Sequence, residues 1–158
     1  MATYAEPISD RRASSRRRDE VIDRDIHPYL VPVGRALFAA IFLLSVPGHF
    51  TSAYIGLAGQ AGVPMANIVV PLSGLLLFLG GLSVLLGFHA RIGAWLLFLF
   101  LISTAFMMHN FWAVSDPVMR AMQQAHFMKN LAMAGAALLI AYWGAGPISL
   151  DRRRLMQV

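Results

Sequence analysis

The feature that most constrains this chain is a long stretch, from Val33 to Trp143, that is almost free of charge. The charged side chains that interrupt it are Arg35, Arg91, Asp116, Arg120 and Lys129. The stretch divides into four apolar blocks, each about long enough to cross a hydrocarbon layer of ~30 Å at ~1.5 Å per helical residue. We therefore expect an integral membrane protein.

The overall composition leads to the same expectation. Hydrophobic residues make up 58% of the 158-residue chain and charged residues 13%, against roughly 45–50% and 25% in soluble domains. A water-soluble chain of this length cannot cover so much apolar surface, and the length suits one compact bundle without a second globular domain. The sequence contains no cysteine, which excludes disulfides, a thiolate nucleophile and a cysteine-held iron–sulfur cluster.

The blocks predict transmembrane helices at about 33–50, 67–87, 92–112 and 122–142. Each block is continuously apolar and lacks the alternation of a barrel strand, so only helices satisfy its backbone in lipid. Pro47 and Gly48 should weaken the last turn of the first helix. Between the blocks, residues 88–91 predict a tight link, 51–66 a longer connection with a short helix, and 114–121 a solvent-facing turn. The predicted fold class is an all-α membrane protein with a four-transmembrane-helix bundle.

The basic residues predict the orientation of this bundle. With four crossings, both termini and the 88–91 link lie on one side, and that side holds 11 of the 13 basic residues. The positive-inside rule then puts both termini in the cytoplasm. We expect a multi-pass protein of the bacterial inner (cytoplasmic) membrane, with the lipid bilayer as its first partner. The arginines expected to set the topology and contact lipid headgroups are Arg35, Arg91, Arg152, Arg153 and Arg154.

Three regions follow from this pattern: a disordered basic cytoplasmic tail at 1–28, a four-helix transmembrane domain at 29–148, and a basic cytoplasmic tail at 149–158. The first tail carries six arginines and should lie near anionic headgroups. The alternative is that it recruits a partner, which would make the protein a non-catalytic membrane scaffold. A nucleic-acid role is not expected, because no aromatic residues are interleaved with the basic run.

Small residues in the second and fourth blocks predict how the helices pack. Examples are Gly80 and Gly81 in the second block, and Gly135, Ala136 and Ala137 in the fourth. Small residues let helix backbones approach closely in lipid. We expect this packing within the bundle, and a homo-oligomer face on the fourth block is the alternative.

Polar side chains from three blocks are expected at the same outer end of the bundle. On the fourth block they are spaced i, i+3 and i+4 and so share one helix face. A charge at the centre of a span costs about 2.5–3.5 kcal/mol, and less near its edge, so a lysine here needs a use or must snorkel to the headgroups. The expected pocket consists of His49, His109, Asn110, His126, Lys129 and Asn130.

The chemistry of this pocket limits the kinds of ligand that it can bind. An ammonium opposes cation binding, and no helix carries a standard histidine pair for a metal, so neither a metal nor a haem is expected. A lysine with neutral imidazoles and amides suits an anion or a carbonyl oxygen. A quinone headgroup between apolar walls from Phe106, Phe111 and Phe127 meets these conditions, although the residues alone leave the cofactor unknown. The sequence has no nucleotide loop, nucleophile triad or carboxylate pair, so an independent enzyme is not expected.

Four segments of the chain carry a likeness to a known family: GRALFAAIFLLSVPGH, SGLLLFLGGLSVLLGFHARIG, FMMHNFW and HFMKNLAMAGAALLIAYWGAGPISLD. Together they resemble the DoxX family of small four-span bacterial membrane proteins. The likeness covers about residues 32–151. It departs from the family pattern at Ser73–Gly74, where members often carry a carboxylate, and at His49, where they often carry a lysine. The resemblance implies a membrane subunit or accessory of a redox complex, quinone-linked or associated with oxidative stress, working with a redox protein partner.

Overall fold

The computed structural model describes residues 27–155, and every regular element in that range is a helix. The predicted tail at 1–28 therefore lies almost entirely outside the described residues. The long helices are α2 (His27–Ser45), α4 (Ala66–Leu86), α5 (Ala90–Met108) and α6 (Pro117–Trp143). The short helices are the 3₁₀ helices η1 (Val46–Phe50) and η2 (Phe111–Ala113), together with α3 (Ser52–Gln60) and α7 (Leu150–Leu155).

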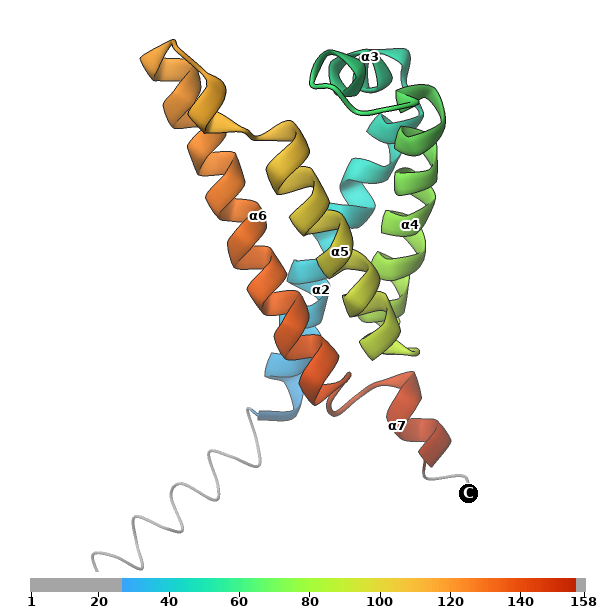
Figure 1. Cartoon of the computed structure of the whole chain (residues 1–158). Coiled ribbons are helices and arrows are strands. Elements are labelled where there is room, and N and C mark those ends of the chain that lie inside the picture. The colour runs from blue at the N-terminus through green and yellow to red at the C-terminus, as the bar shows by residue number, and fades with distance from the viewer. Residues whose placement is uncertain (1–26, 156–158) are drawn as a thin grey trace, which may run out of the picture.

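The long helices run alternately up and down, which gives the bundle two distinct ends (Figure 1). The start of α2, the link between α4 and α5, and α7 lie at one end, here named the α7 end. Helices η1, α3 and η2 and the start of α6 lie at the other, here named the α3 end. Helix α5 packs against both α4 and α6, and α4 also packs against α2.

Among the described residues, three helices are long and apolar enough to cross a membrane: Pro28–Phe50, Ala66–Leu86 and Ala90–Ala113. They match the first three predicted blocks to within a few residues. Helix α6 is the longest at 27 residues, but its first half carries Gln123, Gln124, Lys129 and Asn130, and it is not one of the three. The structure therefore supports an all-helical protein with three candidate spans, and the fourth span stays a prediction.

Helix ends follow local sequence signals. Gly87 adopts a left-handed conformation with φ of 64° directly after α4, a common way to end a helix, and the predicted tight link is confirmed. Asp116 accepts a hydrogen bond from the N–H of Met119 at 2.8 Å, and Pro117 takes the first helical position. Helix α6 therefore begins at residue 117 rather than 122, and the turn predicted over 114–121 is shorter than expected.

The connection between α2 and α4 also follows its sequence. Helix α2 ends at Ser45 and continues as the 3₁₀ helix η1, which contains Pro47 and Gly48. Thr51 then caps α3, its hydroxyl accepting a hydrogen bond from the N–H of Tyr54 at 3.3 Å. The weakened last turn of the first helix and the short helix within 51–66 are both confirmed.

The bundle has a small core and an apolar outer surface. Leu77, Leu97 and Leu101 are among the largest fully buried side chains. In contrast, Leu44 is 81% exposed and Leu37 is 72% exposed, and many other large apolar side chains are also exposed. Soluble monomers rarely expose such extensive apolar surface, so the outer face of this bundle is built to meet hydrocarbon.

Glycines set the close approach of α4 and α5. A Cβ atom at Gly80 would lie 3.1 Å from the side chain of Leu97, and one at Gly93 would lie 2.9 Å from the carbonyl oxygen of Gly80 and would also press on Ser83. Gly135 on α6 has nothing within 4 Å of its Cβ position. The α4–α5 crossing therefore depends on the missing side chains, as small-residue packing in lipid requires.

A buried arginine holds the α7 end together. Arg35 of α2 is 4% exposed, and its guanidinium donates hydrogen bonds to the carbonyl oxygens of Ala145 at 2.7 Å and Ile148 at 2.8 Å. These carbonyls belong to the segment between α6 and α7. An unpaired buried carbonyl costs about 1–3 kcal/mol, so Arg35 fixes the path of this segment against the first helix.

The same segment also binds the α4–α5 link. The Asp151 carboxylate accepts hydrogen bonds from the N–H groups of His89 at 2.8 Å and Ala90 at 3.1 Å, and the N–H of Asp151 donates to the carbonyl oxygen of Gly87 at 2.8 Å. A carboxylate at this position satisfies N–H groups at the start of α5 and favours the helix dipole. The sequence predicts a tail over 149–158, whereas Ser149, which is 5% exposed, and Asp151 are part of the α7 end.

We expect Gly93→Ala to destabilise the protein by about 1–3 kcal/mol, because an added methyl group forces α4 and α5 apart. The matched control is Gly135→Ala, whose methyl group enters open space and should leave the melting temperature nearly unchanged. Thermal unfolding in detergent, followed by circular dichroism, measures both. Equal melting temperatures for the two variants would contradict the close α4–α5 approach.

We expect Arg35→Met to cost roughly 2 kcal/mol or more, because two buried carbonyls lose their donor. It should also make the segment around 145–148 more sensitive to protease. Arg153→Met is the control, since Arg153 is exposed on α7. If the two variants melt alike and are cleaved at equal rates, Arg35 does not hold this segment.

Candidate functional site

Three of the predicted site residues meet at the α3 end, where the end of α5 faces the first half of α6. The rings of His109 and His126 are stacked, with centroids 5.1 Å apart and planes inclined by 22°. The Nζ atom of Lys129 lies 3.3 Å from Nδ1 of His126. His126 and Lys129 are exposed and His109 is half-buried. We name these three residues the polar row.

The hydrogen bonds of the polar row define its donors and acceptors. An ammonium can only donate, so the Lys129 contact requires a lone pair on Nδ1 of His126 and leaves the proton of the neutral ring on Nε2. Nδ1 of His109 lies 2.7 Å from Oε1 of Gln123, which is an acceptor, so here Nδ1 donates. The polar row thus offers two donors, the ammonium of Lys129 and the Nε2–H of His126. The remaining lone pair on the ring of His109 is an acceptor.

Gln123 is a site residue that the sequence analysis missed. It fixes the ring of His109, and it lies on α6 at i−3 from His126 and i−7 from Asn130, on the same helix face. That spacing was the available signal. An uncharged glutamine near a helix start is also a common surface residue, which is why residue type alone did not select it.

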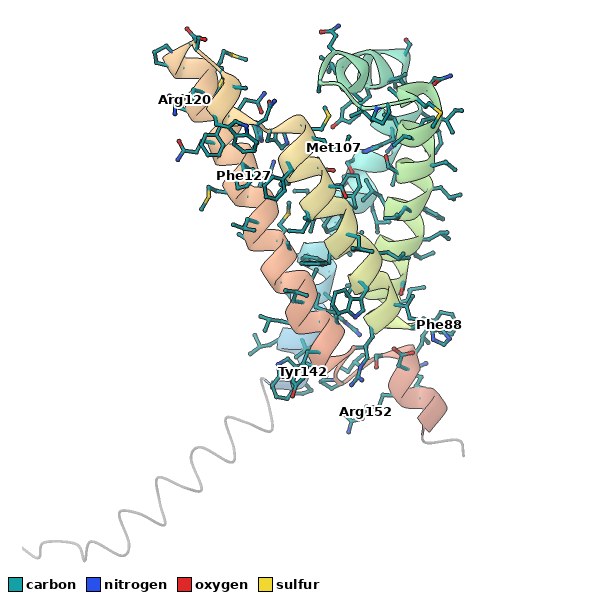
Figure 2. The ribbon with its side chains drawn as sticks, viewed as in Figure 1. Phe88, Met107, Arg120, Phe127, Tyr142 and Arg152 are labelled. Atoms are coloured by element: carbon teal, nitrogen blue, oxygen red, sulfur yellow. The ribbon has the colours of Figure 1, made fainter. Side chains whose placement is uncertain are left out.

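A cluster of aromatic rings borders the polar row. The ring centroid of Phe127 lies 5.3 Å from that of Phe106, 5.5 Å from Phe111 and 5.9 Å from Trp112. These pairs adopt edge-to-face geometries, with planes 70–90° apart, which aromatic quadrupoles favour. Figure 2 shows Phe127 on α6 toward the α3 end, with Arg120 closer to the tip of that helix. The three phenylalanines expected as apolar walls are gathered here, and Trp112 joins them.

Asn130 lies one turn further along α6 from His126, toward the middle of the bundle. Its side chain is 6% exposed, and its Nδ2 has no hydrogen-bond partner within the described part of the chain. A buried amide that lacks an acceptor costs about 1–3 kcal/mol. Asn130 therefore adds an unused donor near the polar row.

The remaining two predicted residues have other contacts. His49 is 5% exposed, its Nδ1 lies 3.0 Å from the carbonyl oxygen of Ser45, and its ring packs on Tyr54 and Phe100 with centroids 5.0 and 6.0 Å apart. Asn110 is exposed, and its carbonyl oxygen accepts the N–H of Ala113 at 2.9 Å. The contacts in residues 27–155 thus join three of the six residues directly and tie His49, in η1, to α2, α3 and α5.

The arginines expected at lipid headgroups belong to the α7 end. Arg91, Arg152 and Arg153 are exposed, and Arg154 lies in α7. Arg35 differs from these exposed arginines because it is buried. Its guanidinium binds the carbonyls of the segment before α7. Contact between these arginines and lipid stays a prediction.

The polar row and the aromatic cluster together favour one kind of ligand. The Lys129 ammonium and the His126 N–H suit a carbonyl or anionic oxygen, and the neighbouring rings suit a flat apolar body. Among residues 27–155 there is no group of three or more His, Cys, Asp or Glu that could hold a metal ion.

Comparisons with known proteins give the family. The SURF4 family model matches residues 55–156, more than half of the chain. The inner membrane protein YqjF of Escherichia coli K12 is 36% identical over 128 residues, which cover 77% of this chain and 89% of the relative. The inner membrane protein YphA of the same organism is 33% identical over 92 residues, covering 58% of this chain and 65% of the relative. No solved structure matches the chain.

These matches overturn the resemblance to the DoxX family, for which they give no support. Leucine, alanine and glycine make up about half of the segments that carried the resemblance, and such compositions recur wherever helices pack closely in lipid. They indicate a helical membrane protein without distinguishing its family.

The relatives are inner membrane proteins, and the structure provides three apolar helices of membrane-spanning length. The chain is accordingly a multi-pass integral protein of the bacterial inner membrane. Given the extent of the family match and the similarity to YqjF, it belongs to the SURF4 family.

Proposed function

We propose that this protein crosses the inner membrane four times, with both termini in the cytoplasm, and that the polar row at its outer end binds the carbonyl head of a lipid-soluble molecule of the quinone class. The observation that carries the proposal is the meeting of Lys129, His126 and His109 beside four aromatic rings.

Two observations support α6 as the fourth span. Its 27 residues extend about 40 Å at ~1.5 Å per residue, enough to cross hydrocarbon with its polar first turns outside. Its Ala134, Ala137 and Ala141 are buried, and the helix packs against α5, which is itself a candidate span. A helix that packs along a spanning neighbour shares its depth in the bilayer.

The quinone class follows from the donors of the row. A quinone ring is flat and apolar and carries carbonyl oxygens that accept hydrogen bonds but donate none. Lys129 and the Nε2–H of His126 supply donors for such an oxygen, and a hydrogen bond to a charged group contributes about 1.5–3 kcal/mol. The edges and faces of Phe106, Phe127 and Trp112 supply a wall on which the ring can stack.

A redox partner protein is not part of this proposal. That expectation came with the DoxX resemblance, and it loses its support with the family correction. The quinone class rests on the donors and aromatic rings at the α3 end, which support binding of a flat carbonyl compound.

The topology is tested by reporter fusions at residues 1 and 158 and by an insertion between 114 and 116. Four crossings predict cytoplasmic reporters at both termini and a periplasmic reporter at the insertion, since the basic residues gather at the α7 end. Alkaline phosphatase and green fluorescent protein activities report the two sides. Termini on opposite faces would reduce the number of spans to three and contradict the proposal.

The ligand is tested by titrating full-length protein in nanodiscs with a short-chain ubiquinone and following tryptophan quenching. We expect Lys129→Met to weaken binding at least tenfold, because it removes the charged donor. Arg120→Met is the matched control, since it removes an exposed cation from the same end of α6 and should bind like the parent. No saturable quenching, or equal weakening in both variants, would rule out this site.

A further inference from the structure

A cavity of about 830 Å³ lies at the α7 end, far from the polar row. Its walls come from the α4–α5 link, the start of α5, the end of α6 and the segment that leads into α7. Two arginines, Arg91 and Arg152, line it together with Ile92, Trp143 and Gly144. In Figure 2, Arg152 lies on α7 and Tyr142, the neighbour of Trp143, lies at the foot of α6.

The charge of this cavity is positive. Within residues 27–155, neither the Arg91 nor the Arg152 guanidinium forms a hydrogen bond or an ion pair. The one carboxylate of the lining, Asp151, accepts hydrogen bonds from the backbone N–H groups of the α4–α5 link through both of its oxygens. Two guanidinium groups therefore face the cavity with their charge uncompensated by that carboxylate.

The backbone holds one of these arginines in position. A Cβ atom at Gly144 would lie 3.2 Å from Nε and 3.7 Å from Nη2 of Arg91, so the guanidinium rests directly against residue 144. Gly144 also adopts a φ of 82°, which a residue with a side chain rarely takes. The end of α6 and the side chain of Arg91 thus form one continuous wall.

The cavity is amphiphilic. Ile92 is 60% exposed and Trp143 is 74% exposed, and both lie beside the arginines. In a protein whose outer surface meets hydrocarbon, these side chains suit acyl chains, and a tryptophan at such a rim is typical of the membrane interface. The arginines line the same cavity, and a guanidinium beside an interfacial tryptophan is suited to a lipid phosphate.

We propose that this cavity binds the phosphate of an anionic phospholipid headgroup. Arg91 and Arg152 hold the phosphate oxygens, since guanidinium groups match phosphate geometry in two-pronged hydrogen bonds, while Ile92 and Trp143 contact the glycerol and the first acyl carbons. This lipid site is independent of the ligand proposed for the polar row.

The test uses full-length protein released from detergent micelles and measured by native mass spectrometry, with phosphatidylglycerol and phosphatidylcholine as probes. Phosphatidylglycerol should bind in one saturable step and more tightly than phosphatidylcholine. Arg91→Gln and Arg152→Gln should each weaken phosphatidylglycerol binding about fivefold, and the double variant should weaken it roughly 25-fold. These values follow from the usual contribution of one arginine near a lipid surface.

Arg153→Gln is the matched control, because it removes the same charge from the next residue of α7, which does not line the cavity. It should bind phosphatidylglycerol like the parent. Equal weakening by Arg152→Gln and Arg153→Gln would mean diffuse attraction to the helix and would overturn the proposal. Equal binding of the two lipids would overturn it as well. Unchanged melting temperatures keep the comparison independent of folding, since all three arginines are exposed.

A competition experiment distinguishes the source of the phosphate. Inorganic phosphate at millimolar concentration should fail to displace phosphatidylglycerol, because it lacks the acyl chains that Ile92 and Trp143 contact. Full displacement by inorganic phosphate would assign the cavity to a free anion and overturn the lipid assignment. A further variant, Trp143→Ser, should weaken the binding of phosphatidylglycerol. It should leave the ratio of the affinities for phosphatidylglycerol and phosphatidylcholine unchanged.

Discussion

The bundle is closed at one end by a single buried guanidinium. Arg35 on the first helix binds carbonyls that follow the last long helix, and Asp151 joins the same segment to the α4–α5 link. Hydrocarbon cannot satisfy backbone groups, so a non-helical segment near it must find its partners within the protein. The α7 end meets this requirement with side chains, which allows residues 144–149 to leave the helical path.

The two ends of the molecule consequently have different chemistry. The α7 end is dense in hydrogen bonds between distant parts of the chain, and Figure 1 shows α6 and α4 further apart at the α3 end than at the α7 end. The polar row lies at that more open end, on α5 and α6 alone. The α7 end thus serves as the scaffold, and the α3 end carries the candidate binding residues. Binding sites are commonly built on a rigid scaffold in this way.

Hydropathy and turn residues were enough to predict most of the fold. Pro47 and Gly48 weakened the end of the first helix as expected, and α4 ended close to the predicted boundary, because the backbone preferences of proline and glycine act locally. Depth along a helix was also predictable, which is why His109, His126 and Lys129 were expected at one end.

The direction of a side chain around the helix axis depends on how neighbours pack, so the enclosure of His49 by Tyr54 and Phe100 was not predictable. Arg35 shows the same limit: its position suggested lipid headgroups, and its partners come from 110 residues later in the chain.

That separation has a consequence for biosynthesis. The first helix leaves the ribosome long before residues 145–148 exist, and at about 5–20 residues per second the intervening 110 residues take on the order of ten seconds. During this interval the Arg35 guanidinium sits near the bilayer without its final acceptors, and water or lipid phosphates must solvate it. The hydrogen bonds that close the α7 end around Arg35 can therefore form only after residue 148 has been synthesised.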